Sequence, residues 1–509
     1  MTGGASMTST SSDVAAPDVE VSSPVGSTRL AHTWWMRLLF VVPVIVLAGF
    51  AVTATAIPAI NVRQLSILDE AAHIDSVFKV PSIDRSGEKF LPQTLDEVSC
   101  RGGVQQWPDW HPPGCGLPQG IPPADYQLGS GGYNTADIHP PTYYFVAAAL
   151  STVGGWFVTA DRVTMMRLTG SLYLAIGVCL TWLLARRLGA NRWAAFGAAG
   201  LLATAPNVLY MSSIVNVDAS VIMASAAFGL AVLSVWRRRS AWWLLPLLAV
   251  ALMLVKMTNL GALIAMALFI VVTAALAPMR TATVHPDEPR SREVTAVSPP
   301  RERETEGPTA LFARWRDSAG SWRSANGHQT LRAVGLSALM ALGAIVVTLG
   351  WSRIQNYRAM IPASELWFTQ QFKVDNLSFS NVGDSLLRFW EPTGLWFPML
   401  SGRPYLGTPL LMITAAVPLG LLVASWFRDR QVFPILLAAL TTMVIAAPIC
   451  VVMNFSVNGV YFNPDFRYGL SVLPFFAAAV AAGLRTRISG AVLSGLALLG
   501  MVTQLVALF

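Results

Sequence analysis

Charged side chains are scarce in this chain. Asp, Glu, Lys and Arg make up 12% of its 509 residues, and hydrophobic residues make up 54%. A soluble domain carries about 25% charged residues, so the composition excludes an ordinary soluble globular domain. It is typical of a polytopic membrane protein, in which many apolar helices cross the bilayer.

The sequence also lacks a surface suited to nucleic acid. The net charge is +7, but no basic stripe interleaved with aromatic residues accounts for it. The arginines gather instead in short loops between apolar runs. We therefore expect no nucleic-acid partner, and we expect the lipid bilayer with its anionic headgroups to be the partner of these arginines.

Cysteine is rare, with four residues in the chain. Cys100 and Cys115 lie in one long polar segment, whereas Cys179 and Cys450 lie singly in apolar runs, where cysteine packs as a small hydrophobic residue. In an oxidising exterior a Cys100–Cys115 disulfide closes a loop of about 16 residues and stabilises the fold by roughly 3 kcal/mol. A zinc site with His111 lacks four suitable ligands, so we expect the disulfide and no metal site.

Long apolar runs are abundant. A membrane-spanning helix needs about 17 to 25 mostly apolar residues, and about eleven stretches qualify. The stretch 241–255 is short, and the interruption at Lys256 is either a kink or a turn. We predict an all-α, polytopic transmembrane fold with spans at 36–58, 168–185, 193–213, 219–236, 241–255, 258–278, 333–352, 405–426, 432–453, 469–484 and 488–508.

Arginine placement predicts the orientation of these spans, because basic residues of short loops stay on the cytoplasmic side. The clusters that mark this side are Arg186, Arg187 and Arg192, then Arg237, Arg238 and Arg239, then Arg428 and Arg430, then Arg485 and Arg487. With the first helix leading outward, the N-terminus and all four clusters lie inside the plasma membrane. The predicted parts are a disordered cytoplasmic tail 1–35, a membrane module 36–278 with the outward loop 59–167, a charged cytoplasmic linker 279–332, and a second module 333–509 with the outward loop 353–404.

The stretch LDEAAHID, residues 68–75, lies just beyond the outer end of the first apolar run. In a helix, Asp69 and His73 share one face and Glu70 points elsewhere. A carboxylate that a partner orients is suited to act as a general base. The alternative is that Asp69 and Glu70 cap a helix beside the membrane, since acids are favoured in a first turn. Asp75 is close by, so the sequence leaves open which acid is catalytic.

A second polar stretch, DIHPPTYY at 137–144, places His139 before two prolines and two tyrosines. Proline starts a helix at low cost, so we expect a helix that lies on the outer surface of the membrane. Taken alone, His-Pro-Pro is typical of a loop.

Together these stretches resemble the GT-C superfamily of polytopic membrane glycosyltransferases. The acidic pair, His-Pro-Pro-x-Tyr-Tyr and then Arg167 opening a span are similar to the arrangement in aminoarabinose transferases, protein O-mannosyltransferases and bacterial relatives with an Asp-Glu-x-x-His motif. NVDAS at 216–220, LVKMTNL at 254–260 and FRYGLSVLP at 466–474 resemble later motifs of the same proteins. The resemblance covers residues 36–278 and a patch near 466. It implies a GT-C-like fold with juxtamembrane helices in the first outward loop.

The resemblance also implies an activity: transfer of a sugar from a polyprenyl-phosphate donor to a cell-envelope glycan, lipid or protein on the extracytoplasmic side. An inverting displacement needs a base for the acceptor hydroxyl and cations for the departing phosphate. Asp69 is the expected base, with Glu70 as its substitute or as a ligand of a sugar hydroxyl. The expected substrate-binding residues are His73, His139, Tyr143, Lys256, Arg467 and Tyr468. No cofactor is identified, and a divalent cation is compatible with this chemistry.

Several of these residues have a structural alternative. Lys256 interrupts an apolar run, where an ionisable group is costly and marks function, but its long side chain can also reach the interface. Arg467 can simply pair with Asp465. Asp218 can cap the helix that follows it. The secondary candidates are therefore Asp75, Asp218, Trp107 and Trp110.

Tryptophans recur in the two outward loops. Trp107 and Trp110 offer flat faces for a sugar ring, and packing around the disulfide explains them equally well. The loop 353–404 contains Trp367, Trp390 and Trp396 but no acid placed like the first-loop pair. We expect this loop to contribute to acceptor binding without an essential base.

The main alternative function is that of a transporter or flippase, because intramembrane charge and broken helices also mark substrate pathways. Transporters commonly contain internal repeats, and the segments 36–278 and 333–508 share no repeated motif. A noncatalytic assembly scaffold is the third alternative. The acids of the long first outward loop favour chemistry at the outer surface.

Overall fold

The computed structural model describes residues 26–66, 68–101, 132–159, 161–238, 241–276, 327–386, 388–390, 417–426, 432–462 and 464–508. The chain divides into two compact units, Met1–Ile45 and Val46–Phe509. Within the first unit, residues 26–45 form the start of helix α1. The second unit contains the remaining elements and the candidate site.

Regular secondary structure in the described residues is helical, apart from isolated β-bridges. The N-terminal half contains α1 (Gly26–Asn61), α2 (Glu70–Lys79), α3 (Pro92–Arg101), η2 (Ala136–Ile138), α4 (Thr142–Gly155), α5 (Arg162–Arg187), α6 (Arg192–Thr204), α7 (Pro206–Ser213), η3 (Val217–Ser220), α8 (Val221–Arg238), α9 (Leu244–Val255), η4 (Met257–Asn259) and α10 (Leu260–Leu276). The C-terminal half contains α13 (Gly327–Arg358), η5 (Ala363–Glu365), α14 (Trp367–Phe372), α15 (Phe379–Asp384), η6 (Arg388–Trp390), α18 (Phe433–Asn458), η7 (Phe466–Ser471), α19 (Leu473–Gly483) and α20 (Arg487–Ala507).

Seven described helices are long and apolar enough to cross a membrane, and the bent pair α6 and α7 makes an eighth candidate. The seven are Val41–Asn61, Arg162–Arg187, Val217–Arg237, Met257–Leu276, Gln329–Arg358, Phe433–Asn458 and Arg487–Ala507. Each coincides with a stretch that the sequence predicts as a span. The predicted class, an all-α polytopic membrane protein, is confirmed.

Four of the eleven expected spans differ from a single long helix. The stretch 193–213 breaks before Pro206 with a bend of 60°, because proline lacks the N–H donor of a continuing helix and favours extended backbone before it. Helices α9 and α19 have 12 and 11 residues, and at 1.5 Å per residue they reach only about 16 to 18 Å of the roughly 30 Å core. Of 405–426, only the helix 417–426 lies within the described residues.

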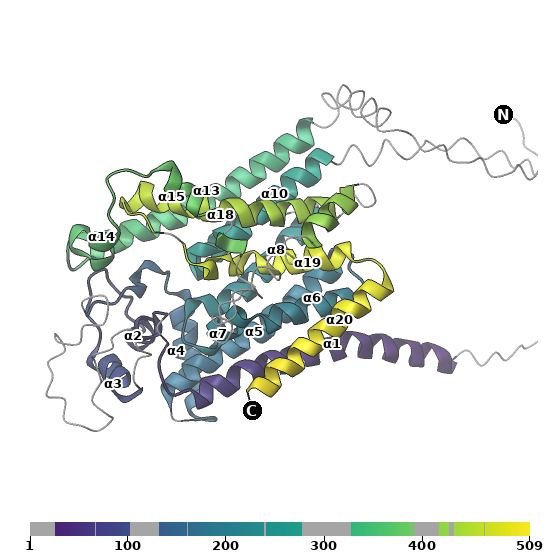
Figure 1. The fold of residues 1–509 in the computed structure, drawn as a ribbon, viewed down its shortest axis with the longest axis horizontal. Helices are drawn as coiled ribbons and strands as arrows, with labels where there is room; N and C mark the ends of the chain where they lie inside the picture. Colours follow the sequence, from purple (N-terminus) through teal and green to yellow (C-terminus); the bar gives the residue numbers. More distant parts are fainter. Residues whose placement is uncertain are drawn as a thin grey trace, which may run out of the picture. The chain divides into compact units, whose positions relative to one another are not determined.

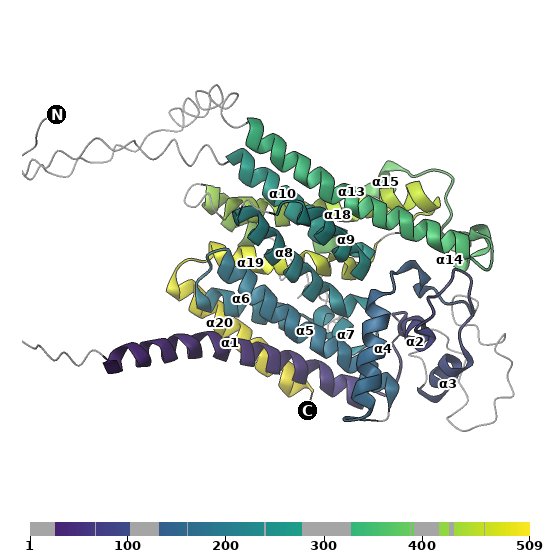
Figure 2. The same cartoon turned by 180° about the vertical axis from the view of Figure 1, so that it is seen from behind.

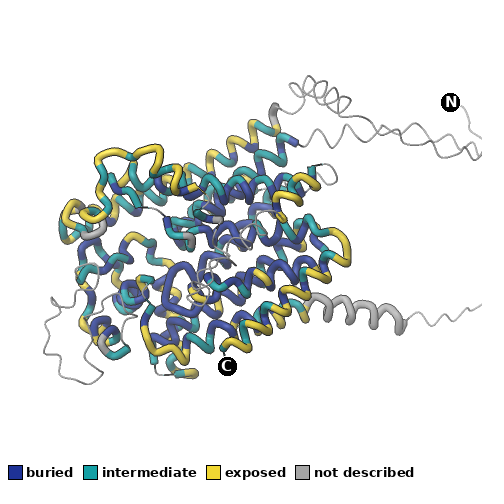
Figure 3. Tube along the Cα trace, in the orientation of Figure 1, coloured by how far each residue is buried: buried dark blue, intermediate teal, exposed yellow. Residues whose placement is uncertain are grey.

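Helix α5 lies at the centre of the second unit, with α4, α6, α8 and α19 packed around it. The most apolar window of α5 is 67% buried, whereas those of α13 and α20 are 22% buried. Figure 3 shows the same contrast, with dark blue along the central helices and yellow along α20. Gly177 permits the close packing of α5, since a Cβ there would lie 2.9 Å from the backbone nitrogen of Met223 on α8.

The two outward loops of the prediction meet at one end of the second unit, where α2, α3 and α14 lie (Figures 1 and 2). Gln355 of α13 donates to the backbone oxygen of Asp84 at 3.1 Å, and the Met360 N–H donates to the backbone oxygen of Ser86 at 2.9 Å. At the other end, Asn191 donates to the backbone oxygen of Leu484 at 3.0 Å, so the loops before α6 and α20 lie together. This segregation agrees with the predicted sidedness, and the end that faces outward stays a prediction.

The cysteines follow the expected division where they are described. Cys100 is disulfide-bonded, and neither Cys179 nor Cys450 forms a disulfide with a described cysteine. Cys115, Trp107 and Trp110 lie outside the described residues, so the Cys100–Cys115 pairing stays a prediction.

Candidate functional site

Asp69 occupies the N-cap position of α2 in a left-handed backbone conformation, with φ 61° and ψ 15°. This conformation is costly for a residue with a side chain, although aspartate tolerates it better than most. The carboxylate makes no capping hydrogen bond. Its side chain is 52% exposed, and its Oδ2 accepts from Nη2 of Arg467 at 3.1 Å. The residue with the costly backbone conformation is therefore the one whose carboxylate contacts Arg467.

Arg467 lies in η7 between three carboxylates. Besides Asp69, its Nε lies 3.4 Å from Asp465 Oδ2 and 3.8 Å from Asp218 Oδ2. The expected Asp465 pair is therefore one of three contacts. Burial opposes the charge of Arg467, but Tyr468 and then the carboxylates raise its pKa.

Lys256 and Asp218 form a buried ion pair beside this guanidinium, with each side chain 1% exposed. Lys256 therefore points to a carboxylate instead of reaching an interface. Asp218 does not act as the cap; Asn216 does, because its Oδ1 accepts the Asp218 N–H at 2.8 Å. Nζ of Lys256 also lies 5.2 Å from the ring centroid of Tyr468, a cation–π distance.

Two buried polar atoms in this cluster, Arg467 Nε and Asp218 Oδ2, have no hydrogen-bond partner among the described residues. Almost every buried polar atom in a folded protein finds such a partner. These two atoms, 3.8 Å apart, are therefore a candidate position for a polar group of a ligand.

His73 is buried, and the partly buried His139 stacks on it next to the charged cluster. The His73 Nδ1 and the Tyr144 hydroxyl are 2.9 Å apart, and the two imidazole rings stack with centroids 5.6 Å apart. Burial first, and then the charge of Lys256, lowers the pKa of both histidines, so both are neutral at neutral pH. The expected side-chain pairing of His73 with Asp69 is replaced by a backbone bond, in which the His73 N–H donates to the Asp69 carbonyl at 3.1 Å.

Glu70 lies apart from this arrangement, although it is the sequence neighbour of Asp69. It is 0% exposed, and both carboxylate oxygens accept from the guanidinium of Arg167, at 2.7 and 2.9 Å. The sequence shows Arg167 only as the start of a span, whereas α5 begins at Arg162 and Arg167 lies one turn inside it. An arginine next to an apolar run is the signal that could have pointed to this pairing.

Asp75 and Tyr143 are also enclosed. Asp75 is 0% exposed, pairs with Lys79 at 2.7 Å and accepts from Thr94 at 2.6 Å. These contacts hold the first-loop helices together. Tyr143 is 1% exposed and packs against Tyr144 and Tyr173.

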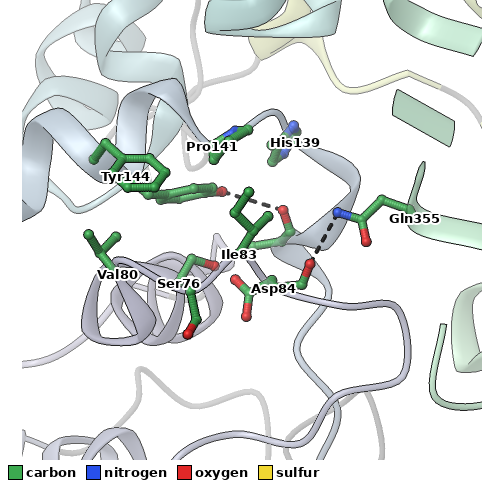
Figure 4. A pocket seen from close by; sticks show the side chains of 11 residues that line it. Ser76, Val80, Ile83, Asp84, His139, Pro141, Tyr144 and Gln355 are labelled. Atoms are coloured by element: carbon green, nitrogen blue, oxygen red, sulfur yellow. Dashed lines mark hydrogen bonds between the residues drawn. The ribbon is translucent and has the colours of Figure 1, made fainter. Parts of the chain in front are cut away.

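A pocket that His139 lines lies between the end of α2, the start of α4 and the end of α13 (Figure 4). Its polar side chains are those of Ser76, Ser82, Asp84, His139, Tyr144 and Gln355. Of these, only His139 was expected at a site. Asp84 and Gln355 were missed because they lie in different loops of the sequence and give no local pattern.

A metal site is not evident in the part of the chain that the structure describes, because no group of three or more His, Cys, Asp or Glu side chains is placed to hold an ion there. The cations present in the cluster are Lys256 and Arg467. They supply the positive charge that an anionic group would meet.

The arrangement of an exposed carboxylate, two cations and two neutral histidines suits acid–base chemistry on an anionic substrate. Residues 138–286 match a family model. Its description is dolichyl-phosphate-mannose-protein mannosyltransferase. No curated protein matches the chain. The match supports a membrane glycosyltransferase of the GT-C type. It includes His139, Asp218 and Lys256, whereas Asp69 and Arg467 lie outside the matched segment.

Proposed function

We propose that the protein transfers a sugar from a polyprenyl-phosphate donor to a cell-envelope glycan, lipid or protein on the extracytoplasmic side of the plasma membrane. The observation that carries the proposal is the half-exposed carboxylate of Asp69 on the guanidinium of Arg467, beside the buried Lys256. A base and phosphate-binding cations are the groups that such a transfer requires.

Asp69 is the general base. Its carboxylate takes the proton of the acceptor hydroxyl as the acceptor oxygen bonds to the anomeric carbon. The bond from that carbon to the phosphate oxygen breaks on the opposite face, and its electron pair leaves with the polyprenyl phosphate. The products are the inverted glycoside, the polyprenyl phosphate and a protonated Asp69.

Arg467 contacts the phosphate in this mechanism. Its side chain is 12% exposed, whereas that of Lys256 is 1% exposed, so the guanidinium is the more accessible cation. Lys256 neutralises Asp218 and thereby leaves more of the Arg467 charge for the phosphate. His73 and His139, both neutral, border the sugar, and Tyr468 lies against the two cations.

Glu70 is not the base in this proposal. Its carboxylate is buried and hydrogen-bonded to Arg167, so an acceptor hydroxyl has no access to it. Asp69 is the member of the acidic pair that solvent and substrate can reach.

Mannose is the first donor sugar to test, because the family description that residues 138–286 match names it. The second outward loop, 353–404, is proposed to contribute to acceptor binding through its tryptophans. The side chains of Trp367 and Trp390 and all of Trp396 lie outside the described residues.

The first prediction is that Asp69→Asn loses about 100- to 10,000-fold in turnover, the usual cost of removing a general base. Transfer of radiolabelled mannose from polyprenyl-phosphate mannose by the purified full-length protein measures it. Asp465→Asn is the matched control, because Asp465 faces the same guanidinium and has no role as a base. We expect a much smaller loss in that variant, and retained donor binding in both.

Two outcomes would count against this mechanism. Near-normal turnover in Asp69→Asn together with an inactive Glu70→Gln would show that Glu70, and not Asp69, is the general base. Movement of the labelled lipid across proteoliposomes without sugar transfer, by wild type and Asp69→Asn alike, would replace the transferase with a flippase.

A further inference from the structure

Arg167 makes an unusually complete set of contacts for a side chain inside an apolar helix. Its Nε and Nη2 donate to the two oxygens of Glu70, at 2.7 and 2.9 Å. Its guanidinium also donates to the backbone oxygens of Val62 and, at 2.8 Å, Gln64. The side chain is 2% exposed. One guanidinium therefore holds both ends of the segment that leads from α1 to Asp69.

Glu70 extends these contacts to a second segment. Its Oε2 accepts the Ser66 N–H at 2.6 Å, and its Oε1 accepts the Val215 N–H at 2.9 Å. Val215 precedes the turn that carries Asp218. A further bond joins the same two segments, since Nδ2 of Asn216 donates to the Leu68 carbonyl at 3.1 Å.

We propose that Arg167 and Glu70 form a positioning clamp, which sets the carboxylates of Asp69 and Asp218 in place around Arg467. This inference rests on the proposed transferase function and gives Glu70 a role that excludes contact with substrate. A left-handed aspartate persists only where its surroundings over-determine the backbone. The clamp supplies that constraint, because it fixes the chain on both sides of residue 69.

The clamp also explains why a charged pair, Arg167 and Glu70, is buried inside the protein. A buried guanidinium is tolerated when a carboxylate neutralises it and when its donors are bonded. Arginine suits this role better than lysine, since its planar fork reaches a carboxylate and two carbonyls at once. Arg167→Lys keeps the charge and removes the fork, whereas Glu70→Gln keeps the shape and removes the charge.

Hydrogen–deuterium exchange of the full-length protein in nanodiscs tests the clamp without any substrate. In both Arg167→Lys and Glu70→Gln we expect faster exchange in two segments together, 62–66 and 213–218. The matched control is Asp75→Asn, a buried carboxylate on the same helix whose partners include Lys79 and Thr94. It should leave both segments as protected as in wild type.

Kinetics distinguish positioning from substrate contact. Misplacement of a catalytic group costs about 100-fold, so each single variant should lose about that much in kcat with little change in binding of polyprenyl phosphate. If Glu70 acts through Arg167, the double variant loses no more than the worse single variant. Independent contact of Glu70 with substrate would instead multiply the two losses.

Unchanged exchange in both segments, or multiplied losses in the double variant, would overturn the clamp. Failure of both conservative variants to fold would also contradict it, because positioning requires a folded protein with loosened loops. If the wild type transfers no sugar from polyprenyl-phosphate mannose or from other polyprenyl-phosphate hexoses, the transferase proposal fails. The exchange experiment still decides the clamp in that case.

Discussion

Three titratable groups of the first outward loop make the stability of the fold depend on pH. His73 and His139 change it in one direction, and Asp137 changes it in the other. Burial lowers the pKa of both histidines, so the unfolded chain binds more protons than the folded protein below about pH 6.5. Their contribution to stability is present above that pH and is lost as the pH falls. Burial raises the pKa of Asp137 to about 6, so its folded form binds more protons between about pH 4 and 6. Its contribution is present at low pH and is lost as the pH rises through 6.

The second prediction follows from these signs. His139→Gln should flatten the decline in thermal stability between pH 7 and 5, because it removes one group that resists protonation in the folded state. Asp137→Asn should steepen the decline, because it removes the group with the opposite sign. Melting temperatures of the purified protein across this pH range measure both effects, and equal slopes in all three proteins would refute the assignment.

Helix packing depends on backbones that approach closely at small residues, as is common between membrane helices. Gly197 of α6 is the clearest case, because a Cβ there would lie 2.6 Å from the backbone nitrogen of Ser494 on α20. Backbone atoms of two packed helices cannot give way as a flexible side chain does. Gly495, the next residue along α20, has no described atom within 4 Å of its Cβ position.

The third prediction compares these two glycines. Gly197→Ala should destabilise the protein by about 1 to 3 kcal/mol, the usual cost of overpacking, and should loosen α20. Gly495→Ala should be neutral or should stabilise the helix by up to about 1 kcal/mol through helix propensity. Thermal unfolding in detergent measures the difference. A Gly197→Ala protein as stable as wild type would show that the helices can separate at this point.

The distribution of loops over the whole second unit matches one orientation in a membrane. Segments of the two predicted outward loops are hydrogen-bonded to one another, as Arg358 donates to the backbone oxygen of Ile83 at 2.7 Å. The arginine-bearing loop ends gather elsewhere, where Arg237 donates to the backbone oxygen of Arg187. Basic loops stay in the cytoplasm during insertion, so we expect the charged cluster of Asp69 and Arg467 to lie outside.

The fourth prediction is that Phe379→Cys reacts with a membrane-impermeant thiol reagent in intact cells, whereas Thr305→Cys reacts only after permeabilisation. Phe379 is 97% exposed in the second outward loop, and residue 305 belongs to the predicted cytoplasmic linker. Serine at Cys179 and Cys450 removes the background labelling of these two cysteines. Labelling of Thr305→Cys in intact cells would show that the predicted orientation is wrong and that the site faces the cytoplasm.

Local sequence patterns predict most of the membrane-spanning helices. The seven long spans coincide with apolar runs, because membrane insertion is governed by the hydrophobicity of each segment and by its flanking charges. The break at residue 206 was present in the sequence as a proline, yet a window that counts apolar residues does not register it. The shortness of α9 was visible in the sequence as a short apolar stretch that ends at Lys256. The apolar stretch 469–484, in contrast, gives no sign that the α-helix α19 begins only at Leu473.

The sequence by itself determined the helical class, the polar character of the two long loops and the choice of Asp69, His139 and Lys256 as residues to watch. Only the tertiary structure decided their partners. Arg467 reaches Asp69 across 398 positions, and Arg167 reaches Glu70 across 97. Hydrophobic periodicity and capping report on neighbours within a few residues, whereas ion pairs of this kind depend on which helices pack together. For that reason two adjacent acids, indistinguishable in sequence, have opposite environments, one half-exposed beside a cation and the other buried under an arginine.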